Sequence, residues 1–165
     1  MFIIIAAIGK NNEIGKNGGL CFHLKNDMEF FREKTINHKV AMGYNTWKSL
    51  PNKLKNRKNI VIYEHDTTGP DKIVHKIDEF INKNKDTNEE IYIIGGGMIY
   101  RQFLPYAKKL YLTEIDATDP EATVFFPVFD QSKYDKMTIK EGSEESLKYT
   151  INEYRRKKWK TAFST

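Results

Sequence analysis

The chain has 165 residues, a formal net charge of +5, 39% hydrophobic residues and 13% aromatic residues. This length supports one domain with one hydrophobic core, and the composition excludes an intrinsically disordered chain. The single cysteine, Cys21, excludes an internal disulfide framework and is typical of a reducing compartment, so we expect a cytoplasmic protein.

The apolar start of the chain predicts the first element. Residues 2–8 form a continuous apolar run that is too short to span a bilayer and has no basic residue before it, as a signal peptide would. We therefore expect a strand that is buried on both faces. The polar, glycine-rich residues 10–19 predict a mobile loop.

Helical and strand patterns then alternate. We predict helices at 26–36, 45–50, 77–84 and 98–104, and strands at 39–42, 59–63, 90–94 and 109–115. The alternating segments 133–141 and 147–159 predict an antiparallel pair joined at 142–145. The pattern favours an α/β fold with one domain over residues 1–165. Its mixed, mostly parallel sheet of about eight strands would have flanking helices and an antiparallel C-terminal edge, with ligands at the carboxyl ends of the strands.

Three glycines after a core strand are the strongest local signal. Gly95, Gly96 and Gly97 follow the apolar segment 90–94 and precede a predicted helix. Glycine lets a ligand approach the backbone closely, and the free N–H groups at the start of a helix attract phosphate. The pattern indicates a phosphate-bearing cofactor, although a plain tight turn would give the same residues.

Asp27 is the second candidate, because it lies at the beginning of an apolar helix. A carboxylate there is commonly an ordinary helix-start charge. In an apolar pocket it would instead be the single acid that binds an amidine-like group. The residue alone favours the ordinary interpretation.

Other chemistries have weaker signals. The four histidines lack metal-ligand spacing, so we expect no metal site, and nothing orients Cys21 and His23 as a nucleophile pair. A nucleic-acid-binding protein is the alternative from a different class. It would rest on the basic run at 155–160, which is more typical of a solvated surface, so we expect no nucleic-acid partner.

The order and spacing of several short motifs resemble the dihydrofolate reductase family from residue 2 to about residue 154. The motifs are Ala6-Ala7, Ile14-Gly15, Leu24 with Asp27 and Phe31, Met42-Gly43 with Thr46-Trp47, Leu54 with residues 57–60, residues 94–97 with Tyr100, Leu112-Thr113 with Ile115-Asp116, and residues 125–127. The resemblance implies reduction of 7,8-dihydrofolate to 5,6,7,8-tetrahydrofolate in one-carbon metabolism, with hydride transfer from NADPH to C6 and protonation at N5. It also implies binding of folate analogues, a monomer, and no membrane partner. A pyrimidine reductase of the same fold, from the riboflavin pathway, is the nearest alternative.

The resemblance also implies roles for individual residues. The catalytic residues would be Asp27, Phe22 and Thr113. The substrate-binding residues would be Ile5, Asp27, Met28, Phe31, Leu50, Leu54, Arg57, Ile94 and Thr113, and Arg57 would bind the α-carboxylate of the glutamate tail. The cofactor-binding residues would be Ala7, Ile14, Gly15, Gly19, Leu20, Gly43, Asn45, Thr46, Tyr63, Glu64, Lys76, Gly95, Gly96, Gly97, Met98, Ile99, Tyr100 and Gln102.

The chain departs from the family pattern in the closing loop, which the resemblance places at residues 10–24. Cys21-Phe22 replaces the usual Pro-Trp, so the aromatic bulk remains but the indole N–H that would hold a water is lost. The segment 119–123 is one residue longer than usual, and the acidic residue expected there is not clearly present. The tail at 157–165 has no assigned role.

A second departure concerns the adenosine 2′-phosphate. The positions that match the family's basic and hydroxyl side chains are Tyr44, Tyr63, Glu64 and Met98, none of which is a cation. An acidic side chain there would repel a phosphate and favour a free ribose hydroxyl. Asn45, Thr46, His65 and Lys76 remain as phosphate partners. NADPH is therefore the expected cofactor and NADH the alternative.

Overall fold

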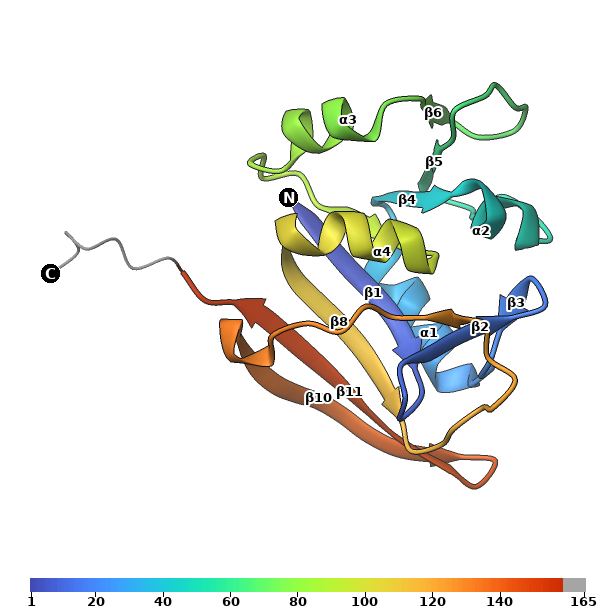
Figure 1. Cartoon of the computed structure of the whole chain (residues 1–165), viewed down its shortest axis with the longest axis vertical. Helices are drawn as coiled ribbons and strands as arrows, with labels where there is room; N and C mark the ends of the chain where they lie inside the picture. The colour runs from blue at the N-terminus through green and yellow to red at the C-terminus, as the bar shows by residue number, and fades with distance from the viewer. Residues whose placement is uncertain (159–165) are drawn as a thin grey trace, which may run out of the picture.

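A computed structural model describes residues 1–158 of the chain. The strands of its main sheet are β1 (Phe2–Ile8), β4 (Lys39–Gly43), β5 (Lys58–Ile62), β6 (Lys72–Val74), β7 (Ile91–Ile93), β8 (Ala107–Ile115), β10 (Tyr134–Glu144) and β11 (Leu147–Arg156). They lie in the order β10-β11-β8-β1-β7-β4-β5-β6 (Figure 1). The pairs from β8 to β6 are parallel, whereas β10 and β11 form an antiparallel edge. The predicted sheet is confirmed.

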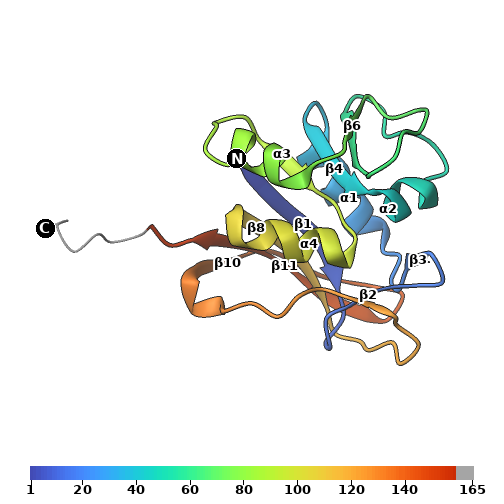
Figure 2. The same ribbon diagram turned by 45° about the horizontal axis from the view of Figure 1, so that its top comes forward.

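Four α-helices cover the two faces of this sheet. They are α1 (Lys25–Thr35), α2 (Tyr44–Ser49), α3 (Ile77–Asn84) and α4 (Gly97–Phe103), each within one residue of its predicted bounds, and short 3-10 turns follow at Leu104–Tyr106 and Gln131–Lys133. Figures 1 and 2 show α3 and α4 on one face and α1 behind the sheet. In the described part of the chain, no helix has the length and apolar character needed to cross a bilayer.

The alternation of side chains along β1 builds two cores. Phe2 and Ile4 belong to the core under α3 and α4, whereas Ile3 and Ile5 belong to the core under α1. All four side chains are at most 5% exposed. Each such side chain contributes roughly 1.5–3 kcal/mol through burial, which explains why the strand has no polar face.

The prediction of a mobile loop at 10–19 was wrong. Residues in this segment form β2 (Glu13–Lys16) and β3 (Gly19–Leu20), which join β9 (Val124–Phe125) in a second sheet of order β3-β2-β9. Glu13 and Ile14 are buried there. The polar composition concealed β2 because one of its partners, β9, lies more than 100 residues away along the chain; β3 pairs with β2 alone.

Two other expectations also need correction. Strand β6 was not predicted. The turn of the C-terminal hairpin lies at Glu145 and Ser146, whereas the sequence predicted it at 142–145. Both turn residues have positive φ, 50° and 67°. The predicted strand to residue 159 ends at Arg156, and the residues from 159 onward lie outside the described part of the chain.

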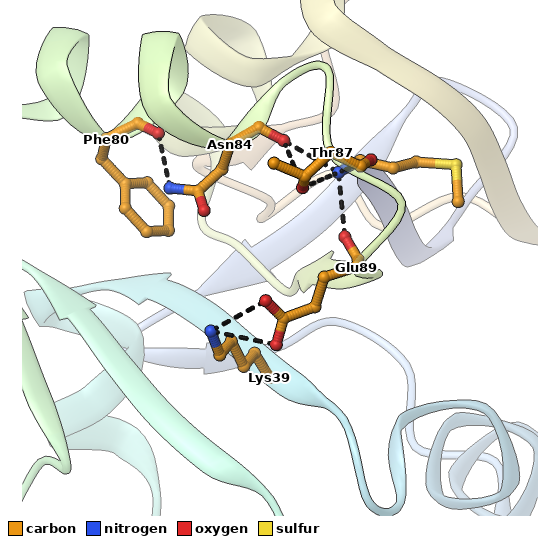
Figure 3. A network of polar contacts seen from close by, with 6 residues as sticks. Lys39, Phe80, Asn84, Thr87 and Glu89 are labelled. Atoms are coloured by element: carbon orange, nitrogen blue, oxygen red, sulfur yellow. Dashed lines mark hydrogen bonds and ion pairs between the residues drawn. The ribbon is translucent and has the colours of Figure 1, made fainter.

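The amino ends of the parallel strands are joined by polar contacts (Figure 3). The amino group of Met1 donates to the carbonyl oxygens of Asn84, Thr87 and Glu89 at 2.8–2.9 Å, and Lys39 Nζ pairs with Glu89 Oε1 at 3.0 Å. At the opposite, carboxyl edge, the Gly43 N–H donates to the Gly95 carbonyl at 2.9 Å. This bond joins the carboxyl end of β4 to the segment that follows β7. Ligands of parallel sheets bind at the carboxyl ends of the strands, so we expect the ligand site at this edge.

Candidate active site

The central polar contact of the carboxyl edge joins Asp27 to Thr113. Asp27 lies in the first turn of α1, and Thr113 is a buried residue of β8. The Thr113 hydroxyl donates to Asp27 Oδ1 at 2.6 Å. Burial raises the pKa of Asp27, the bond from Thr113 opposes this rise, and the charge of Glu144 adds to it. Asp27 is therefore a partly buried acid whose protonated form is favoured relative to an exposed carboxyl.

Glu144 also fixes the beginning of α1, a role that sequence analysis missed. Its carboxylate oxygens accept the backbone N–H groups of Lys25 at 2.6 Å and Asn26 at 3.1 Å. These are unsatisfied donors of a helix start, and a negative charge is favourable there. Because Glu144 lies at the end of β10, 119 residues beyond Lys25, no local motif could reveal the contact.

Apolar side chains gather beside Asp27. Ile5 is part of the core under α1, and the other predicted members of the substrate slot that pack against this core are half-buried. These members are Phe31, Leu50, Leu54 and Ile94, and Phe22 of the closing loop packs against the same core. Met28 is 53% exposed and lies further out on α1. The arrangement places one partly buried acid at an apolar surface, which suits a flat ring that carries an amidine-like group.

A cationic group stands near the apolar surface. Arg57 Nη1 donates to Thr35 Oγ1 at 3.1 Å, Arg57 Nε donates to the Lys55 carbonyl at 3.0 Å, and the guanidinium carbon lies 6.0 Å from the centre of the Phe31 ring. Burial, followed by the charge of Arg32, lowers the pKa of Arg57. Arg57 is thus oriented before any ligand arrives.

Arg57 also lines an open pocket of about 320 Å³ with a basic rim. Arg32, Lys53 and Lys55 supply the other cations of this rim. A carboxylate ligand would therefore meet several positive charges, of which Arg57 offers the planar pair of N–H groups.

Asn59 holds the segment that carries Arg57, and sequence analysis gave it no role. Its side chain is fully buried. Asn59 Oδ1 accepts the Leu54 N–H at 3.1 Å, while Nδ2 donates to the carbonyls of Leu54 at 2.9 Å and Arg57 at 3.0 Å. The amide therefore fixes both ends of the turn that presents Leu54 and Arg57.

The glycine turn has the shape needed for a diphosphate group. A Cβ on Gly97 would lie 3.0 Å from Val124 Cγ1, and one on Gly95, where φ is +121°, would lie 3.3 Å from the Tyr100 hydroxyl. At Gly96 the nearest atom would be Thr46 Oγ1, at 3.6 Å. Side chains at Gly95 and Gly97 would thus crowd the turn, and Gly96 leaves its backbone accessible toward Thr46, so these residues fit a dinucleotide diphosphate.

The remaining predicted cofactor residues lie around this turn in three groups. Ala7 on β1 and Tyr100 on α4 lie on one side, and the Tyr100 hydroxyl donates to the Ile5 carbonyl at 2.8 Å. The small sheet supplies Ile14, Gly15, Gly19 and Leu20. The end of β4, helix α2, the segment after β5 and helix α4 supply Gly43, Asn45, Thr46, Tyr63, Glu64, Met98, Ile99 and Gln102.

The structure gives less support to the residues expected to bind the adenosine 2′-phosphate of the cofactor. The rings of Tyr44 and Tyr63 stack at 3.9 Å, and Lys48 Nζ lies 5.0 Å from the centre of the Tyr44 ring. Glu64 is exposed, and Lys76 Nζ lies 3.7 Å from Glu79 Oε1 in an exposed pair. The stacked rings of Tyr44 and Tyr63, with Lys48 nearby, therefore occupy the place expected for the 2′-phosphate. Sequence analysis did not single out Lys48.

Segment 119–123 carries an acidic group that contacts the closing loop. Asp119 supplies the acidic group there, and its Oδ2 lies 2.6 Å from Lys16 Nζ of β2. This ion pair joins the segment after β8 to the closing loop.

Comparisons with known proteins agree with this geometry. A family model described as "Dihydrofolate reductase" matches residues 1–156. The chain belongs to the dihydrofolate reductase family. The dihydrofolate reductase of Bacillus subtilis is 33% identical over 88% of this chain and 86% of its own length, and that of Buchnera aphidicola subsp. Acyrthosiphon pisum is 38% identical over 92% of both. The solved structure of the dihydrofolate reductase from Enterococcus faecalis, complexed with NADP(H) and RAB-propyl, has a TM-score of 0.86 and 29% identity to this member of the family, covering 96% of this chain and 97% of that one.

Proposed function

We propose that this chain is an NADPH-dependent dihydrofolate reductase that converts 7,8-dihydrofolate to 5,6,7,8-tetrahydrofolate. The observation that carries the proposal is the hydrogen bond between the partly buried Asp27 and the buried Thr113, beside an apolar surface. Membership of the dihydrofolate reductase family and the NADP(H) complex of the Enterococcus faecalis enzyme support the same activity. We further propose that the chain acts as a single-domain monomer in the cytoplasm, without a nucleic-acid or membrane partner.

Substrate recognition divides between two ends of the slot. Asp27 would bind the 2-amino group and ring nitrogen of the pterin, with Thr113 orienting the carboxylate through its 2.6 Å bond. Ile5, Phe31, Leu50, Leu54 and Ile94 would contact the rings, with Met28 at the outer edge. Arg57 would bind the α-carboxylate of the glutamate tail through two parallel hydrogen bonds. Antifolates that carry a diaminopyrimidine ring would bind Asp27 through the same hydrogen bonds.

Proton delivery follows from the burial of Asp27. Burial raises the pKa of this carboxyl, so it holds a proton at a higher pH than an exposed aspartate. N5 of the pterin must gain a proton as C6 gains hydride. Asp27 need not touch N5, because its negative field raises the basicity of N5 and a water can carry the proton.

The cofactor supplies the hydride. The backbone of Gly96 and Gly97 would bind its diphosphate, while Ala7, Ile14 and Tyr100 would contact the nicotinamide and exclude water from it. Ile14 and Tyr100 are at most 7% exposed, which limits their movement. Phe22 would close the slot above the reacting rings, so these residues act by orientation and exclusion of water.

The assay that tests this function follows the loss of reduced-nicotinamide absorbance when dihydrofolate is added. The wild type and Asp27→Asn are compared, each with NADPH and with NADH. We expect dihydrofolate-dependent oxidation that falls by about 10² or more in the variant. Folded wild-type protein that oxidises neither cofactor would refute the proposal, and a pyrimidine substrate of the riboflavin pathway would then be the next one to test.

A further inference from the structure

Glu13 is a buried carboxylate that the proposed mechanism does not use. Its residue is 2% exposed. Oε1 accepts the Asn11 N–H at 2.6 Å, and Oε2 accepts the Asp119 N–H at 2.6 Å. Each oxygen therefore binds a different loop, and we call this arrangement the Glu13 bridge.

The Glu13 bridge is one of several contacts between the same two segments. Lys16 pairs with Asp119, the Thr123 N–H donates to the Gly15 carbonyl at 2.9 Å, and the Phe126 N–H donates to the Asn12 carbonyl at 2.8 Å. The other contacts are ladder bonds or a partly exposed ion pair. Among these contacts, only that of Glu13 places a charged group in the buried space between the two segments. Hydrogen bonds to charged acceptors are strong there and costly to lose.

The segments that the bridge joins lie against both ends of the proposed cofactor site. A Cβ on Gly9 would lie 2.7 Å from Glu13 Oε1 and 2.9 Å from Phe22 Cε2, so the carboxylate and the Phe22 ring meet across Gly9. On the other side, Val124 of β9 limits the space at Gly97. Strands β2 and β9 pair antiparallel, and Val124 of β9 lies against Gly97, the first residue of α4. A change in the bridge would therefore reach Phe22 and the glycine turn together.

We propose that Glu13 is a positioning residue for cofactor binding and turnover. Its carboxylate holds residues 10–22 against residues 116–126, and this contact keeps Ile14 and Phe22 over the nicotinamide end of the site. The proposal rests on the proposed dihydrofolate reductase activity for its catalytic part. Its structural part, the closed contact between the two segments, is measurable without any turnover.

The single cysteine of the chain provides the structural measurement. The Cys21 N–H donates to the Ile14 carbonyl at 2.8 Å, and burial followed by the nearby Asp119 raises the pKa of the Cys21 thiol. Cys21 is half-buried in this arrangement, and opening of the two segments would expose its thiol further to 5,5′-dithiobis(2-nitrobenzoate), whose reaction is followed by absorbance. The rate is measured with and without NADPH.

The variant is Glu13→Gln, which keeps one acceptor oxygen but points an amide NH₂ at the other backbone N–H. We expect its Cys21 to react about tenfold faster, which corresponds to the loss of one charge-assisted hydrogen bond. We also expect a KM for NADPH about tenfold higher and weaker protection of Cys21 by NADPH. The control is Glu121→Gln, because Glu121 is an exposed carboxylate of the same segment, 3.8 Å from Lys16. This variant should stay within twofold of the wild type, a limit set by the small worth of exposed ion pairs.

The outcomes separate the two proposals. Equal Cys21 rates in the wild type and Glu13→Gln would overturn the positioning role, and so would a faster rate with unchanged KM for NADPH. A wild type without dihydrofolate-dependent turnover would overturn the proposed function, whereas the labelling rates would still decide whether the bridge holds the two segments together.

Amide hydrogen exchange on the wild type avoids reliance on a variant that folds. The Asn11 and Asp119 N–H groups lie outside the helices and strands but bind a buried carboxylate. We expect both to be protected, and to exchange about tenfold more slowly with NADPH bound. Exchange as fast as that of exposed loop amides would overturn the inference.

Discussion

Replacement of Asn59 by alanine tests how the Arg57 end of the slot is built. The side chain is fully buried and makes three hydrogen bonds to the backbone of Leu54 and Arg57. At about 1 kcal/mol net for each bond, Asn59→Ala should cost about 3 kcal/mol of the free energy of unfolding. For a chain of this size the melting temperature should fall by about 6–12 °C, measured by thermal unfolding followed by circular dichroism.

The same change should alter the kinetics in a specific way. The turn at 54–57 would lose its fixed geometry, so Arg57 would bind the glutamate tail less well. Losing about 1.4 kcal/mol of that contact raises the KM for dihydrofolate about tenfold. The value of kcat should stay within about twofold, because the tail is bound alike in the ground state and the transition state.

Asn84→Ala is the matched control for Asn59→Ala. The Asn84 side chain donates one hydrogen bond, to the Phe80 carbonyl at 2.8 Å, at the far end of α3 (Figure 3). It should cost about 1 kcal/mol and leave the KM for dihydrofolate unchanged. If Asn59→Ala lowered the melting temperature but left that KM equal to the wild-type value, the proposed support of Arg57 would be refuted.

Three further predictions concern the site itself. Asp27→Asn should unfold at a higher temperature than the wild type at pH 7. The folded state raises the pKa of Asp27 above its ordinary value of 3.8, so ionisation destabilises the fold as pH rises through that window, and the difference should disappear below pH 3.8. Glu64→Gln should raise the ratio of kcat/KM for NADPH over NADH by about two- to fivefold, and an unchanged ratio would place Glu64 away from the phosphate. Phe22→Trp should change turnover by supplying an N–H donor for a water near the pterin, and an unchanged kcat would argue against a water held there.

The sequence predicts the parts of this molecule that depend on local pattern. The apolar runs of β1, β5 and β8 and the helical spacing of α1 gave the sheet and its helices nearly to the residue. The apolar slot was an expectation from the family resemblance. Of its apolar members, Ile5, Phe31, Leu50, Leu54 and Ile94 share one core, whereas Met28 is exposed. Local pattern suffices here because burial depends on a side chain's own chemistry.

The missed features are polar side chains that bind backbone groups, and two of the three have partners that are distant along the chain. Glu13, Asn59 and Glu144 look like ordinary surface residues in the sequence, yet each accepts backbone N–H groups at a decisive position. For Glu13 and Glu144 the partner lies more than 100 residues away. A buried carboxylate and an exposed one have the same local sequence signature, so only the fold distinguishes them.

The bond from Glu144 to the start of α1 makes the last hairpin part of the apparatus that presents Asp27. Asn26 Nδ2 also donates to the Tyr149 hydroxyl at 2.9 Å, so both strands of the hairpin contact the helix. In a nascent chain that has not yet paired β10 with β11, Asp27 would lie on a helix whose first N–H groups lack the Glu144 carboxylate. Substrate-binding competence should therefore arise only when synthesis is nearly finished, and two separately expressed fragments divided before β10 should regain it on mixing.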